Sequence, residues 1–201
     1  RKSATYYALT QAAIPAFAED YAYLGWGLLE LYEASFEPWA LESAFDLADR
    51  LLEKHADPRG GFFQGGEGEE PNGIRLQPSG DGALPSANSV ALLLLLKLSR
   101  IGDRPGYWKA AEGILRRHSA LVRRHPQGYA FFLLGLDFYY GPSYEVVVAG
   151  EEGAEDTAGM CRALHRTFLP RAVKILRPTD QAEPPILRLA PFTRPYGKSA
   201  D

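Results

Sequence analysis

The sequence has little cysteine and no long apolar run. A single Cys161 in 201 residues excludes an internal disulfide framework and fits a reducing compartment, so we expect a cytoplasmic protein. The longest apolar run, 90–96, is far shorter than the roughly 20 residues that cross a bilayer. Nothing near Arg1 resembles a signal peptide. We expect no membrane partner.

The chain also has no large excess of charge of either sign. The formal net charge is −3, and lysine and arginine are spread along the chain, so no basic surface for nucleic acid is expected. No pair of the four histidines has metal-ligand spacing. The stretch AGEEGAEDT (149–157) places acidic residues where a nucleotide phosphate would need a glycine-rich turn. We therefore predict no metal and no cofactor.

Helical periodicity, by contrast, is abundant. Apolar residues recur at helical spacing in 20–34, 38–52, 87–100, 105–125 and 129–140. The first and third of these segments are apolar on most sides, whereas the second and fourth carry a single apolar stripe. The alternation predicts two hairpins, each with an inner and an outer helix.

Repeated hairpins of this kind predict a mainly α protein built as an α/α toroid, in which inner helices surround a cavity. We assign 1–142 to the toroid hairpins. The apolar runs 144–150 and 172–176, with a helical stripe over 156–168, predict a parallel strand-helix-strand appendage within 143–178. The proline-rich remainder, 179–201, is expected to be an extended tail.

The connection 56–85 is longer than the roughly 12–15 residues usual for a loop, and such loops are often functional. We expect short strands at 60–63 and 74–76 to hold it in place.

Acidic residues stand before both predicted inner helices. If these helices run in the same direction, Asp20 and Asp81 lie at the same end of the cavity and are candidates for general acid and base. The alternative is helix capping, because Asp and Ser before a helix are preferred caps worth about 1 kcal/mol. The substrate would be positioned by neighbouring aromatic and polar side chains, namely Glu19, Tyr21, Trp26, Phe62, Arg75, Ser86 and Asn88. Ser86 is at the same time the expected N-cap of the helix that starts at Ala87.

Five separated stretches carry a family resemblance. They are IPAFAEDYAYLGWGLLELYEA (14–34), GGFFQ (60–64), DGALPSANSVALLLLLKL (81–98), GPSYEVVVAG (141–150) and FLPRAVKIL (168–176). In this order they resemble the YyaL family, also known as the spermatogenesis-associated protein 20 family. The resemblance implies a thioredoxin-like domain fused to an (α/α)6 barrel similar to those of sugar epimerases and six-hairpin glycosidases.

The resemblance covers the second half of the barrel and the appendage, and the chain starts at Arg1 without methionine, so we expect a fragment. Its partners would then be a sugar ligand and the missing thioredoxin-like domain and first barrel half, with a homo-oligomer possible through the open edge. The catalytic histidines of the epimerases have no counterpart here. A non-catalytic scaffold or binding domain is the alternative function; a helical-repeat module fits the glycine-rich loop poorly.

Overall fold

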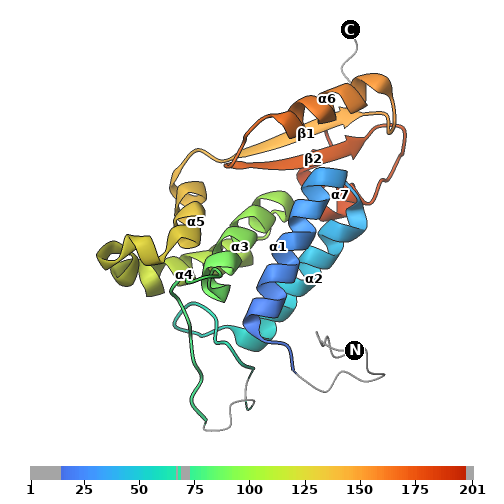
Figure 1. Cartoon of the computed structure of the whole chain (residues 1–201). Coiled ribbons are helices and arrows are strands. Elements are labelled where there is room, and N and C mark those ends of the chain that lie inside the picture. Colours follow the sequence, from blue (N-terminus) through green and yellow to red (C-terminus); the bar gives the residue numbers. More distant parts are fainter. Residues whose placement is uncertain (1–14, 67, 69–72, 198–201) are drawn as a thin grey trace.

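The computed structural model describes residues 15–66, 68 and 73–197. It is mainly helical, with one two-stranded parallel sheet. Figure 1 shows the sheet at one end of the helical part and the connection between α2 and α3 at the other. The prediction of a mainly α protein is confirmed.

Two antiparallel helical hairpins form the larger part of the molecule. The first consists of α1 (Ala18–Ser35) and α2 (Pro38–His55), and the second of α3 (Ala87–Gly102) and α4 (Pro105–Arg124). A proline at the first turn starts α2 and α4, where its missing N–H removes no helical hydrogen bond. The short helix α5 (Ala130–Tyr140) follows the second hairpin.

Helix α3 lies at the centre of the core. It contacts α1, α4 and α5, and its leucines Leu92 and Leu94–Leu96 are completely buried. Gly135 of α5 lets the two helices approach closely, since a Cβ there would lie 2.6 Å from the Leu92 side chain. The prediction of a helix that is apolar on most sides and therefore largely buried is confirmed.

Helix α1 differs from the prediction. It packs on α2 and α3, but Phe17, Leu24 and Leu31 remain 42–51% exposed. The sequence pattern correctly indicated apolar residues on several faces, but the described part of the chain covers only some of them. We call Phe17, Leu24 and Leu31 the α1 stripe.

The connection between α2 and α3 contains little regular secondary structure. Among its described residues, one antiparallel bridge joins Ala56 to Phe62 and 74–76 forms no strand, so the prediction of two short strands is wrong. Gly60 has φ 104°, and a Cβ on it would lie 2.3 Å from the Gly113 carbonyl oxygen of α4. Only glycine permits both this backbone conformation and this approach.

The strand-helix-strand unit forms as expected. Strands β1 (Tyr144–Gly150) and β2 (Ala172–Pro178) pair in parallel, and α6 (Glu155–Arg166) connects them. The remainder is not simply extended: α7 (Ile186–Leu189) and the 3-10 turn η2 (Pro191–Thr193) fold back, and Ile186 and Leu189 join the core. Folding back buries these apolar side chains, which is favourable, whereas an extended tail would leave them in water.

Candidate functional site

The N-terminal ends of α1 and α3 lie at the same end of the molecule. Near these ends, the Tyr23 hydroxyl donates to the Pro85 carbonyl oxygen at 2.7 Å. Further along both helices, Lys97 Nζ of α3 lies 3.1 Å from Glu33 Oε2 of α1. From the first contact to the second, the residue numbers increase in both α1 and the α3 segment, so the two helices are parallel. Their N-terminal ends therefore lie together. We call these ends and the adjoining loop, with Glu19, Tyr23, Gln64 and Asp81, the rim.

Asp81 is the most heavily bonded carboxylate of the rim. Its Oδ1 accepts from the Ser86 backbone N–H at 2.8 Å. Its Oδ2 accepts from the N–H groups of Phe131 at 2.8 Å and Phe132 at 3.2 Å. These two N–H groups belong to the first turn of α5, whose own N-cap residue, Tyr129, makes no side-chain cap bond. Asp81 therefore caps α5, although it lies 50 positions earlier in the sequence, and it links α5 to the start of α3.

Asp20 and Glu19 lie in the first turn of α1. Asp20 Oδ2 accepts from the Phe17 N–H at 2.9 Å, which is a capping interaction. Glu19 Oε1 accepts from Gln64 Nε2 of the GGFFQ stretch at 3.4 Å. Capping thus accounts for the positions of Asp20 and Asp81, and their role as acid and base stays a prediction.

Tyr23 is a rim residue that the sequence analysis missed. Burial raises the pKa of its hydroxyl, and the nearby carboxylates of Asp81 and Glu19 raise it further. The phenol is therefore a neutral hydrogen-bond donor at physiological pH. Tyr23 follows Glu19 by four residues, about one helical turn, and this spacing could have indicated that both lie on the same face of the helix.

Asn88 and Ser86 organise the loop side of the rim. Asn88 is fully buried and holds Phe62 by both backbone groups: Oδ1 accepts from its N–H at 2.8 Å and Nδ2 donates to its carbonyl at 3.0 Å. Nδ2 also donates to the Pro78 carbonyl at 2.9 Å. Ser86 Oγ accepts from the Ser89 N–H at 3.1 Å, which confirms the predicted N-cap. Both residues position the backbone of the loop.

The other predicted contact residues pack against different partners. Tyr21 is buried against the ring of His55, and Phe62 is buried as well. Trp26 packs edge-on against Phe131 of α5. Arg75 lies over the ring of Phe63, at 4.0 Å from the ring centre, and donates to the Gly65 carbonyl. The rim itself thus unites Glu19, Tyr23, Gln64 and Asp81, and the substrate-binding roles of the remaining residues stay predictions.

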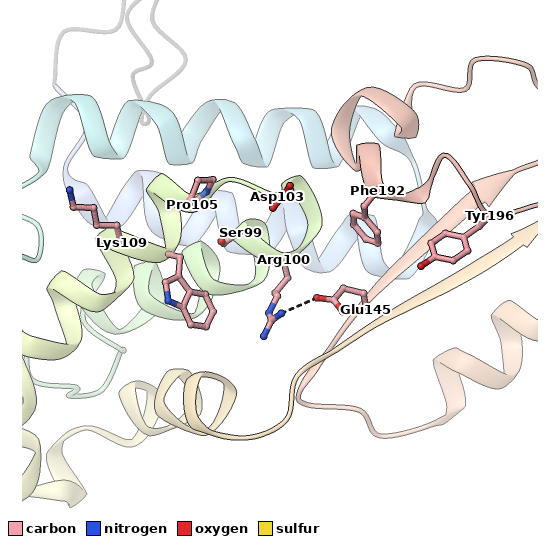
Figure 2. Close-up of a pocket in the computed structure, with 9 residues that line it drawn as sticks. Ser99, Arg100, Asp103, Pro105, Lys109, Glu145, Phe192 and Tyr196 are labelled. Atoms are coloured by element: carbon pink, nitrogen blue, oxygen red, sulfur yellow. Dashed lines mark hydrogen bonds and ion pairs between the residues drawn. The ribbon is translucent and has the colours of Figure 1, made fainter.

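A cavity of about 630 Å³ lies at the opposite end of α3, between the helices and β1. In Figure 2 the Arg100 guanidinium points toward Glu145 of β1, and Phe192 and Tyr196 form the wall beside them. Arg100 Nη1 and Glu145 Oε1 are 3.3 Å apart. None of the site residues predicted from the sequence is among the described residues that line this cavity.

Among the described residues, no group of three or more His, Cys, Asp and Glu side chains is placed to hold a metal ion. Within the same residues, the helices are too short or too polar to cross a bilayer.

The fold and the rim define a mainly helical domain in which α1 and α3 run parallel and a capped loop adjoins their N-terminal ends. No family model matches the chain. Spermatogenesis-associated protein 20 of Mus musculus and that of Homo sapiens are each 34% identical to it over 166 residues, which is 82% of this chain and 21% of the relative. An uncharacterised protein of Caenorhabditis elegans is 27% identical over 156 residues.

The chain belongs to the spermatogenesis-associated protein 20 family, as its five motif stretches indicated. It spans about a fifth of the length of these relatives.

Proposed function

We propose that the chain is a scaffold segment of an α/α barrel, in which α1 packs against a further helical hairpin of the full-length protein. The α1 stripe carries this proposal. Leu24 and Leu31 are spaced by seven residues, so they lie on one face of the helix, and Phe17 is the N-cap residue just before it. All three side chains are 42–51% exposed. Such a row is the seam by which a helix packs on its neighbour. The limited coverage of the relatives supports an occupant from the same protein.

The capping bonds of the rim agree with this role. A scaffold needs its loops fixed and its helix ends satisfied, and the carboxylates of Asp20 and Asp81 are used in this way. The thioredoxin-like domain implied by the family resemblance would be a further partner within the same protein. We place this protein in the cytoplasm, because its single Cys161 fits a reducing compartment.

The scaffold role predicts a stability effect that depends on context. Leu24→Gln combined with Leu31→Gln should lower the melting temperature of the full-length protein by about 5 °C or more, because a packed seam becomes polar. The same pair should leave the 201-residue chain within about 2 °C, since both side chains are exposed there. Differential scanning calorimetry of both proteins measures the two effects.

The control is Leu121→Gln, which changes a leucine of similar exposure, 43%, on α4. Equal melting temperatures for the substituted and unsubstituted full-length proteins would contradict packing at the α1 stripe.

A carbohydrate-binding rim is the second candidate function. The observation in its favour is the convergence of Glu19, Tyr23 and Asp81: burial raises the pKa of Tyr23, and the two carboxylates raise it further. Carboxylates accept hydrogen bonds from sugar hydroxyls, and the Tyr23 oxygen, whose proton is donated to the Pro85 carbonyl, can accept one as well. In this role Asp81 would position the loop, and Glu19 and Tyr23 would contact the sugar.

Saturation-transfer NMR with a panel of mono- and disaccharides tests the rim. We expect at least one sugar to give a signal that Glu19→Gln combined with Tyr23→Phe reduces about tenfold or more, because two hydrogen-bonding groups are changed. Glu53→Gln, at an exposed position of α2, is the control and should not alter the signal. Absence of a signal from every sugar would leave the scaffold role alone.

A further inference from the structure

A groove between α4 and α5 lies apart from both the rim and the α1 stripe. Its volume is about 520 Å³, within the usual range for small-molecule sites. The apolar side chains Leu115 and Val122 of α4, with Phe132 and Leu136 of α5, line it. No role described above uses this groove.

The floor of the groove is already well packed. Phe132 is fully buried, and Leu115 and Val122 are 9% and 4% exposed. A further helix, about 10 Å across, would therefore cover little additional apolar surface. A slender apolar body, such as one alkyl chain or one aromatic ring, matches this floor better.

Two arginines stand along the groove. Arg116 and Arg123 are seven residues apart on α4, which corresponds to about 10 Å along one side of the helix. Both are exposed, and within the described residues neither guanidinium has a carboxylate partner. Arg123 lies in the last turn of α4, where the helix dipole alone favours a cation, but Arg116 lies two turns earlier.

The one carboxylate among the described residues of the groove is already used. Glu112 Oε1 accepts from Trp108 Nε1 at 3.2 Å and from the Tyr139 hydroxyl at 3.0 Å. These two donors hold Glu112 at the Trp108 end of the groove. Within the described residues Glu112 forms no ion pair with Arg116 or Arg123, so both guanidinium groups are left to bind an anion.

We propose that the groove binds a small amphipathic carboxylate, with its carboxylate on Arg116 or Arg123 and its apolar body over Leu115, Val122 and Leu136. Arginine suits this task because its planar fork donates two parallel hydrogen bonds to one carboxylate. The two arginines allow the carboxylate to be held at either end of the groove.

Octanoate is a suitable probe, and octanamide is its uncharged counterpart. In isothermal titration calorimetry of the 201-residue chain we expect octanoate to bind with a dissociation constant of about 1 mM or below, and octanamide about tenfold more weakly. The difference follows from the loss of charge-assisted hydrogen bonds.

Arg116→Gln combined with Arg123→Gln should weaken octanoate binding about tenfold and leave octanamide binding unchanged. Both side chains are exposed, so the melting temperature should stay within about 2 °C. Arg124→Gln combined with Arg166→Gln is the control, because it removes the same charge at exposed positions outside the groove and should not change binding.

Three results would overturn the proposal. The first is no octanoate binding at 10 mM or below, a limit of about 3 kcal/mol. The second is equal binding of octanoate and octanamide, which would indicate apolar contact without anion recognition. The third is equal weakening by the groove and control pairs, which would indicate attraction by net charge alone.

Discussion

Replacement of Lys97 by methionine is expected to lower the free energy of unfolding by about 3–5 kcal/mol, because it leaves a buried carboxylate without its partner. Lys97 of α3 is 6% exposed, and its Nζ lies 3.1 Å from Glu33 Oε2 and 3.3 Å from Glu30 Oε1 of α1. Glu33 is 5% exposed, whereas the Glu30 side chain is 51% exposed. Glu33 would therefore bear most of the loss.

The backbone of Glu33 also connects the helices to the strand-helix-strand unit. His165 of α6 contacts the Glu33 carbonyl oxygen through Nε2 at 2.9 Å, and its ring stacks on Phe36. Unfolding monitored by urea denaturation and by hydrogen exchange over α1, α3 and α6 should show the loss in all three helices. Lys109→Met, at an exposed position of α4, is the control and should cost less than about 0.5 kcal/mol.

The double variant Glu33→Leu with Lys97→Met distinguishes the contribution of the ion pair from that of the packing of the lysine side chain. Removing both charges also removes the cost of burying them, so stability should return to within about 1–2 kcal/mol of the original protein. A double variant as unstable as Lys97→Met would show that the lysine stem, and not its charge, supports the core.

Acid should partly rescue the Lys97→Met variant. Burial raises the pKa of Glu33, and Lys97 opposes this shift, so removing Lys97 raises the pKa further. A raised pKa in the folded state means that the folded protein holds the proton more tightly than the unfolded chain, and stability is lost as the pH rises through the folded pKa. The destabilisation by Lys97→Met should therefore be smaller near about pH 5 than near about pH 7.5.

Local sequence signals predicted the elements of the fold well. Pro38, Pro105 and Ser86 mark helix starts that the structure reproduces, and the β1 bounds agree as well. These signals work because caps, first-turn prolines and helical periodicity depend on neighbours within one or two turns. The mainly α class and the parallel strand pair follow from them.

Predictions that depend on distant partners fared differently. Glu33 and Lys97 are 64 positions apart, and Asp81 is 50 positions from Phe131, so neither contact leaves a local pattern. Leu24 and Leu31 read as core residues because periodicity reports an apolar face, but it does not report whether that face is covered. For the same reason Asp81 could be recognised as a residue of interest, but its three N–H partners could not.

Replacement of Asp81 by alanine is expected to lower the free energy of unfolding by about 2–4 kcal/mol. It removes a cap from the first turn of α5, worth about 0.5–2 kcal/mol, and leaves part-buried N–H donors unpaired at about 1–3 kcal/mol. Asp81→Asn retains one acceptor oxygen but turns an NH₂ group toward these donors, so we expect about half of that loss. Urea denaturation of both variants measures these values.

The position of the loss distinguishes capping from a role in a binding site. If Asp81 is a distant cap, amide exchange should accelerate at Phe131 and Phe132 of α5 and at Ser86, the three donors that it holds. Asp46→Ala, at a carboxylate that is 72% exposed on α2, should leave exchange and stability unchanged. A fully stable Asp81→Ala variant that loses sugar binding would refute the capping role and favour Asp81 as a residue that contacts the ligand directly.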